Sequence, residues 1–427
     1  MKASLQAGVT TREVWSWAAF DFANSGYTTV VMTAVFNAYF VGVVAGNAEW
    51  ATFLWTAVVA ASNALGVLVM PFVGGLADRH ANKKTWLFAA TALAVLGTFG
   101  LAFSGPGTIV WSASMVLISN LGYILGETLN SAFLPELSKP ESVGRISGLG
   151  WSFGYLGGIA TLGCALVIVQ FGPKHGFGLD ACVSATLAAT AVVFMLASTP
   201  TFLWLKERAK PSETHAAEGA TASLAATFRA LLSLREFPDF GLLAVCGFLY
   251  QSGVSVVISL SAVYASAVMG FTTEDTILMV FVVNFTAAAG AYLFGKLQDR
   301  IGHKAALGLT LLLWLAMAAI AATTQSRALF WAAANLAGLA MGSSQSAGRA
   351  MAAVFAPPAR TAEFFGYWNT ALWLAAIVGP LAYGSVAWAT GNNHRLAIGV
   401  TALFFVAALV VLGFIRVERG ARRAREA

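Results

Sequence analysis

The segment GGLADRHANK at residues 74–83 recurs as GKLQDRIGHK at residues 295–304. Both copies follow the pattern G-x-L-x-D-R-x-x-x-K, and their aspartates, Asp78 and Asp299, are 299 − 78 = 221 residues apart. Each copy lies between two long apolar runs. A repeat of about half the chain length indicates a duplicated architecture. The sequence therefore predicts two equivalent halves, each with one polar turn of the same design.

The composition of the chain is that of a membrane protein. Of its 427 residues, 58% are hydrophobic and only 10% are charged. A soluble domain carries about 25% charged residues, so this chain lacks the polar side chains that cover a soluble surface. Several apolar runs reach the roughly 18 residues that can cross a bilayer as a helix. We therefore expect an all-α polytopic membrane protein and exclude a soluble enzyme.

Twelve membrane-spanning helices are predicted, six in each half. The polar stretch 206–236 has the composition of a linker, and its last part, 224–237, has an apolar face that predicts a short surface helix. The expected domains are a first six-helix bundle (1–205), the linker, and a second six-helix bundle with a basic tail (237–427). The spans are expected at roughly 14–43, 51–73, 85–104, 108–132, 146–170, 180–205, 238–269, 275–294, 305–323, 327–350, 364–389 and 395–415.

The basic residues predict the orientation of these spans. If the N-terminus is cytoplasmic, the cytoplasmic segments contain all lysines and arginines except Lys174, Arg327 and Arg395, which is 22 of 25. Because basic residues accumulate on the cytoplasmic side of membrane proteins, we expect both termini and the linker in the cytoplasm. The net charge of +6 is then a topology signal, and a nucleic-acid partner is not expected.

Several kinds of site are not found in the sequence. It contains no Walker loop, no HExxH sequence and no cluster of cysteines and histidines. We therefore expect no cofactor, no metal site and no enzymatic activity. Any transport by this chain would therefore be secondary, driven by a gradient rather than by ATP. We expect a location in the cell (inner) membrane, a small-molecule substrate and protons as a candidate coupling ion.

Six plus six spans, with the duplicated turn between the second and third span of each half, resemble the major facilitator superfamily. The first copy departs from that signature at Ala81, where the second copy has Gly302. The resemblance implies two pseudo-symmetric bundles that give alternating access to a central cavity. We expect the protein to work as a monomer. In that fold the first, fourth, seventh and tenth spans line the cavity.

The two motif copies predict a gate on the cytoplasmic side. Their glycines allow helices to approach closely, and their aspartates can accept hydrogen bonds at the N-terminus of a neighbouring helix. Their arginines can pair with acids near helix ends, such as Glu136 or Glu363. A solvated turn is the plainer alternative, although a chance recurrence at matching places is improbable. The predicted gate residues are Gly74, Asp78, Arg79, Gly295, Asp299 and Arg300.

A narrower resemblance rests on the run WSWAAFDFANSGYTTVVMTAVFNAYF at 15–40. It is similar to the opening of the vacuolar amino-acid effluxer family, the autophagy-related branch. Supporting segments are NSAFLPEL (130–137), GRISGLGWSFGYLGG (144–158) and EFFGYWNTALWLAAIVGPL (363–381). This resemblance implies efflux of amino acids or related small polar solutes. A lipophilic-drug or lipid exporter, a sugar transporter and a non-transporting sensor or scaffold are the alternatives.

Polar side chains inside the predicted spans mark the candidate cavity, because such groups are costly in hydrocarbon. In the span 14–43, Asp21, Asn24 and Thr28 share one helical face. A similar stripe runs along the span 108–132. Hydrogen bonding that only holds the bundle together is the alternative for each single residue. The predicted substrate or coupling cavity contains Asp21, Asn24, Thr28, Asn120, Tyr123, Glu127, Asn130, Gln251, Asn335, Gln345, Arg349 and Asn369.

Asp21 and Glu127 are the clearest functional candidates in this set. Each lies about two helical turns, about 10 Å, from the cytoplasmic end of its span, as a proton-coupling carboxylate requires. A structural ion pair with Arg145 is the alternative for Glu127. A structural ion pair with Arg349 is the alternative for Asp21. Glu127 and Arg349 occupy equivalent places in the two halves (349 − 127 = 222), and we expect them to close the gate or bind the charged ends of the substrate.

Overall fold

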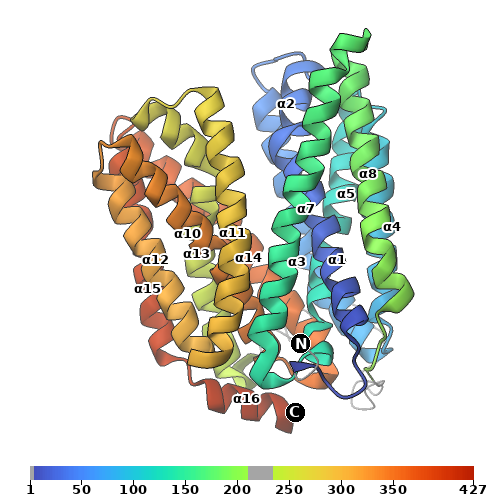
Figure 1. Cartoon of the computed structure of the whole chain (residues 1–427), viewed down its shortest axis with the longest axis vertical. Coiled ribbons are helices and arrows are strands. Elements are labelled where there is room, and N and C mark those ends of the chain that lie inside the picture. The colour runs from blue at the N-terminus through green and yellow to red at the C-terminus, as the bar shows by residue number, and fades with distance from the viewer. Residues whose placement is uncertain (1–3, 210–233) are drawn as a thin grey trace.

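The structure, a computed structural model, describes residues 4–209 and 234–427. Its helices form two bundles that lie side by side (Figure 1). The first bundle contains α1 (Thr11–Tyr27), α2 (Phe36–Tyr39), α3 (Ala51–Arg79), α4 (Lys83–Leu101), α5 (Ile109–Ser131), α6 (Leu134–Leu137), α7 (Val143–Phe171) and α8 (Leu179–Trp204). The second bundle contains α10 (Pro238–Met269), α11 (Thr273–Ile301), α12 (His303–Thr323), α13 (Arg327–Phe355), α14 (Thr361–Ala389), α15 (His394–Phe414) and α16 (Val417–Glu426).

The predicted all-α polytopic fold is confirmed. Within the described residues, eleven helical stretches are long and apolar enough to cross a membrane. The remaining predicted span, 327–350, is the tenth in chain order and corresponds to α13, which is 29 residues long but less apolar than the eleven. Its small and polar side chains, including Arg349, are buried against neighbouring helices. A helix shielded in this way need not be apolar along its whole length, so six spans in each half agree with the structure.

The first span does not continue as a regular α-helix. After α1 the chain passes through two π-helical segments, Thr28–Ala34 and Phe40–Val44, which flank α2. A π-helix has wider turns than an α-helix, so the polar stripe predicted from a 3.6-residue period does not hold beyond Thr28. The sequence pattern did not predict this change.

The surface helix predicted over 224–237 lies mostly outside the described residues. The part that the structure describes, Leu234–Glu236, is a single 3₁₀ turn. It leads directly into α10, which begins at the predicted position.

Most of the duplicated motif is helical. The spans expected to end at 73 and 294 continue as α3 and α11 through both motif aspartates. The turns follow, and there Ala81 has φ +49° while Gly302 has φ +90°. Glycine adopts positive φ without steric strain and alanine does not. The departure from the motif at Ala81 therefore keeps a positive φ at this position and adds strain to it.

The two bundles meet at the end of the molecule that holds both termini, and their ribbons separate toward the other end (Figure 1). At the shared end α3 packs on α14 and α7 packs on α11. Glycines make these crossings close, because a Cβ on Gly74 would overlap the carbonyl of Ala362 and a Cβ on Gly148 that of Ala291. Side chains on facing helices therefore come within hydrogen-bonding reach.

Candidate functional site

A buried ion pair joins the two bundles. Asp21 Oδ2 on α1 lies 2.8 Å from Arg349 Nη1 on α13, and the two side chains are only 5% and 3% exposed. The guanidinium also donates from Nη2 to the carbonyl of Ser147 at 2.9 Å and from Nε to its hydroxyl at 3.2 Å. Removing one member of such a pair leaves an uncompensated buried charge. The structure thus contains the ion pair named above as the alternative for Asp21.

The other oxygen of Asp21 is held by Asn130 on α5. The Asn130 amide donates to Asp21 Oδ1 at 2.9 Å, and the Trp17 indole donates to the carbonyl of Asn130 at 2.8 Å. The guanidinium of Arg349 lies 4.9 Å from the ring centroid of Trp17 and 5.1 Å from that of Trp151. A cation over an aromatic face is attracted by the quadrupole of the ring. Four helices thus contribute to the position of one ion pair.

Gly150 on α7 leaves the space that this ion pair occupies. A Cβ at this position would overlap Asp21 Oδ2 and lie 2.5 Å from Arg349 Nη2. It would also lie 2.8 Å from the ring of Trp17. Glycine is therefore needed here because side chains approach its backbone closely.

Glu127 lies one helical turn from Asn130 on α5 but is bound differently. Its Oε2 accepts a hydrogen bond from the amide of Asn24 at 2.9 Å, and its side chain is half-buried. In the part of the chain that the structure describes, Glu127 forms no ion pair. Arg145 faces Asp299 of the second bundle, with Nε 3.8 Å from Oδ2. The alternative that pairs Glu127 with Arg145 is therefore wrong.

Two further predicted cavity residues lie where the bundles face each other. The ring of Tyr123 packs against Tyr27 in its own bundle and Trp373 in the other, with centroids 5.5 and 5.9 Å apart. Asn369 on α14 donates to the hydroxyl of Thr128 on α5 at 2.8 Å. The Tyr123–Trp373 and Asn369–Thr128 contacts join the two bundles, as the ion pair does.

Other predicted cavity residues lie away from the ion pair. Asn120 donates to Ser62 at 2.7 Å and to Asn63 at 2.9 Å, joins α5 to α3, and is 1% exposed. The structure thus places it inside the first bundle rather than at the bundle interface. Asn335 donates to the carbonyl of Trp331 on its own helix. Within the described residues, no hydrogen bond joins the ion pair to Thr28, Gln251, Asn335 or Gln345.

The duplicated motif makes matching contacts between the bundles. Asp78 Oδ2 accepts the backbone N–H of Glu363, in the first turn of α14, at 2.9 Å. Both carboxylate oxygens of Asp299 accept the backbone N–H of Arg145, in the first turn of α7, at 3.2 Å. The free N–H groups and positive dipole end of a helix stabilise a carboxylate there. These are the helix N-terminal hydrogen bonds that the motif predicted; their action as a gate stays a prediction.

The motif arginines differ from the prediction. Neither Arg79 nor Arg300 forms an ion pair within residues that the structure describes. Of their expected partners, Glu136 pairs with Lys83, and Glu363 pairs with Arg360, three residues earlier in the chain. Both motif arginines lie in the last turn of a helix, where a positive charge is favoured without an acidic partner.

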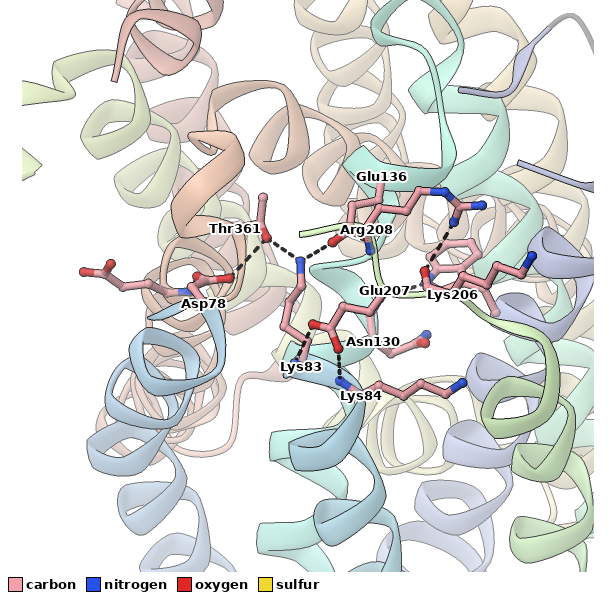
Figure 2. Close-up of polar contacts among 11 residues, drawn as sticks. Asp78, Lys83, Lys84, Asn130, Glu136, Lys206, Glu207, Arg208 and Thr361 are labelled. Atoms are coloured by element: carbon pink, nitrogen blue, oxygen red, sulfur yellow. Dashed lines mark hydrogen bonds and ion pairs between the residues drawn. The ribbon is translucent and has the colours of Figure 1, made fainter. Parts of the chain in front are cut away.

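Sequence reasoning missed two residues of this interface. Ser147 holds the guanidinium of Arg349, and nothing but its place in a helix rich in small residues marked it. Lys83, the last residue of the motif, is fully buried and donates to the hydroxyl of Thr361 on α14 at 3.0 Å (Figure 2). Its recurrence in both motif copies was the available signal, but recurrence alone did not name its partner.

Comparison with known proteins relates the chain to a family of transporters. The family model described as "Vacuole effluxer Atg22 like" matches residues 38–425. The "Uncharacterized MFS-type transporter YxiO" of Bacillus subtilis is 24% identical over 414 residues, which is 96% of each chain. "Autophagy-related protein 22" of Yarrowia lipolytica is 22% identical over 356 residues, which is 75% of this chain and 59% of that protein.

Solved structures show the same fold at low sequence identity. The human organic anion transporter MFSD10 (TETRAN) aligns with a TM-score of 0.70 and 15% identity, covering 94% of this chain and 99% of that one. The proton:xylose symporter XylE, a major facilitator superfamily protein, aligns with a TM-score of 0.71 and 16% identity, covering 95% of both chains. The chain therefore belongs to the Atg22-like vacuole effluxer family and is a secondary transporter of the major facilitator superfamily.

Proposed function

We propose that this transporter exports amino acids or related small zwitterionic solutes across the cell membrane, with both termini in the cytoplasm. One observation carries the proposal. Where the bundles meet, the cation of Arg349 pairs with Asp21, which also binds Asn130. Glu127, one helical turn from Asn130, is a carboxylate without a cationic partner among the described residues. An amino acid carries one carboxylate and one ammonium group, so it complements both charges.

Binding of such a solute would compete with the contact between the bundles. Arg349 belongs to the second bundle, while its partners Asp21 and Ser147 belong to the first. A solute carboxylate that binds the guanidinium replaces Asp21 and weakens the link. A ligand shifts a conformational equilibrium by its difference in affinity for the two states. Competition for Arg349 is therefore a physical route from substrate binding to opening of this end.

The closed end is the cytoplasmic end in this proposal. The topology predicted from the basic residues assigns both termini to the cytoplasm, and both termini lie at the end where the bundles meet (Figure 1). Loading from the cytoplasm then requires the contacts of Arg349, Asp78 and Asp299 to break together as the bundles rock.

Glu127 is the proposed site of proton coupling. It is half-buried and accepts one hydrogen bond from the neutral amide of Asn24. Asp21, in contrast, is engaged by a guanidinium and an amide and is almost fully buried. A group that exchanges protons must be reachable from water, which favours Glu127 as the exchanging acid and Asp21 as the fixed one.

A binding screen followed by transport assays tests the proposal. Purified protein is melted with amino acids, peptides, sugars and lipophilic drugs, because a ligand of the folded state raises the melting temperature. Flux of the best ligand is then measured in vesicles with and without a pH gradient. Glu127→Gln should abolish the effect of the gradient and Arg349→Ala the flux. Wild-type flux in both variants, or stabilisation by sugars alone, would overturn the proposal.

One observation favours a lipophilic solute as the second candidate. An apolar groove of about 400 Å³ lies between α3 and α5, toward the end away from the termini. Eight of its nine lining residues are apolar, and Ser114 is the exception. Stabilisation by drugs or lipids but not by amino acids would favour this candidate.

A cross-link that locks the two bundles together distinguishes a transporter from a scaffold. A locked transporter loses flux, whereas a locked scaffold keeps its partner.

A further inference from the structure

The residues that follow α8 turn back under the first bundle and attach to α4. Leu205, the first of them, is fully buried. The carboxylate of Glu207 caps the start of α4, accepting the N–H of Lys83 at 2.6 Å and that of Lys84 at 3.1 Å. The Lys84 ammonium donates back to the carbonyl of Leu205 at 2.7 Å. The N–H groups of a first helical turn lack intrahelical partners, so this attachment satisfies groups that need one.

Arg208 extends the attachment to two other elements. Its backbone N–H donates to Oε2 of Glu136, which lies in α6, at 2.8 Å. Its guanidinium lies 2.8 Å from the carboxylate of Glu13 on α1 and donates to the carbonyl of Gly8 at 3.1 Å. The side chain of Glu13 is only 3% exposed. Arg208 therefore fixes Glu136 relative to the start of α1.

Glu136 carries this attachment on to the second bundle. Its other oxygen pairs with Lys83, whose side chain is fully buried. Lys83 in turn donates to Thr361 at the start of α14 at 3.0 Å, and Thr361 lies 3.5 Å from Asp78. Figure 2 shows these side chains converging from α3, α4, α14 and the segment after α8. A continuous polar chain thus runs from Arg208 to the motif contact between α3 and α14.

The second motif copy does not repeat this chain. Lys304 is the counterpart of Lys83, since 304 − 83 = 221. It donates to the carbonyls of Gly413 at 2.7 Å and Ile415 at 2.9 Å, at the end of α15 in its own bundle. The polar chain between bundles is therefore a property of the first copy, and this asymmetry argues that the residues beside α4 have a role of their own.

We propose that Glu207 and Arg208 are positioning residues of the cytoplasmic gate. They hold Lys83 and Glu136 in the geometry that reaches Thr361, and so they favour the state in which α3 and α14 are joined. A buried ion pair depends on every partner that satisfies it. Separation of α14 removes one partner of Lys83, and release of Arg208 removes one partner of Glu136. Docking of this segment and closure of the gate therefore stabilise each other, as coupled equilibria must.

The test compares two variants with an adjacent control in the full-length protein. Glu207→Gln replaces one acceptor oxygen with an amide that cannot accept from the helix start. Arg208→Ala removes the tie to Glu13, and Arg208→Lys keeps a positive charge for rescue. Lys206→Ala is the control, because Lys206 is exposed and its side chain forms no hydrogen bond or ion pair within the described residues.

The readout is the distance between spin labels at His80 and Ala359, at the two sides of the contact, in a Cys164→Ser background. Both variants should raise the ratio of long to short distances by at least about fivefold, a typical lower value for coupled sites. Arg208→Lys should restore most of the short distance, and Lys206→Ala should match the wild type.

Two results would overturn the proposal. One is an unchanged distance distribution in both Glu207→Gln and Arg208→Ala. The other is a lower melting temperature without a change in the distances, which would mean that the segment only stabilises the first bundle. The measurement needs no substrate. Its outcome is therefore independent of whether the transported solute is an amino acid.

Discussion

Replacing Gly150 with alanine should separate Asp21 from Arg349 without removing either charge. The added Cβ would overlap Asp21 Oδ2 and lie 2.5 Å from Arg349 Nη2 and 2.8 Å from Trp17. At such distances the neighbours must move. Asp21 and Trp17 are packed within the first bundle, whereas Arg349 enters from the second. Withdrawal of Arg349 relieves part of the overlap, so we expect Gly150→Ala to favour separation of the bundles at this end.

The magnitude follows from two opposing limits. Overpacking of a well-packed interior costs about 1–3 kcal/mol. Removing one partner of a buried ion pair costs about 3–5 kcal/mol, but here both charges remain and Asp21 keeps its hydrogen bond from Asn130. The lower range therefore applies. A loss of about 1–3 kcal/mol in the closed state corresponds to roughly a 5- to 150-fold change in the ratio of closed to open protein.

Spin-label distances between His80 and Ala359 measure this ratio. Gly163→Ala on the same helix is the matched control, because a Cβ there would meet no atom within 4 Å. It should leave the distances unchanged and gain up to about 1 kcal/mol in helix propensity. If Gly150→Ala and Gly163→Ala give the same distance distribution, the ion pair does not hold the bundles together and the reasoning fails.

Four further substitutions test the motif and its turns. Asp78→Asn removes the charge at the N-terminus of α14, weakens that contact by about 0.3–1 kcal/mol and should lengthen the distance between the labels at His80 and Ala359. Asp299→Asn, at the N-terminus of α7, should lengthen the same distance. Unchanged distances in both variants would contradict a gate. Gly302→Ala places a side chain at φ +90°, ψ 155° and should lower the free energy of unfolding by about 1–3 kcal/mol, seen as a lower melting temperature. Ala81→Gly relieves a φ of +49° and should raise the melting temperature by the equivalent of up to about 1 kcal/mol; a decrease would show that the turn is not strained.

Much of the fold could be predicted from the sequence, because spans depend on local composition. Apolar runs predicted the membrane helices, and the spacing of Asp78 and Asp299 predicted the two halves. Two features of the helices were not predicted. The π-helical segments after α1 have no signature in the apolar period of the sequence. α3 extends to Arg79 because its polar last turn is covered by the start of α14.

The partners of the polar residues could be predicted only in part. Asn120 and Asn130 belong to one predicted stripe, yet Asn120 bonds to α3 within its bundle while Asn130 bonds to Asp21. A stripe shows which side chains share a helical face, but the neighbouring helices decide what each one meets. Along the 23 residues of α5, the partner of each polar side chain depends on where α5 crosses α1 and α3. No local sequence pattern contains the positions of these crossings.

By itself, the sequence determined that this is a duplicated helical membrane protein with a polar signature in each half. Hydropathy and charge act locally along the chain, so these properties can be read without a structure. Only the tertiary structure decided that Asp21 and Arg349 form one buried pair, and that Lys83 rather than Arg79 reaches across the bundles. Asp21 and Arg349 are 328 residues apart in sequence. They meet because glycines let the helices of the two bundles approach at one end.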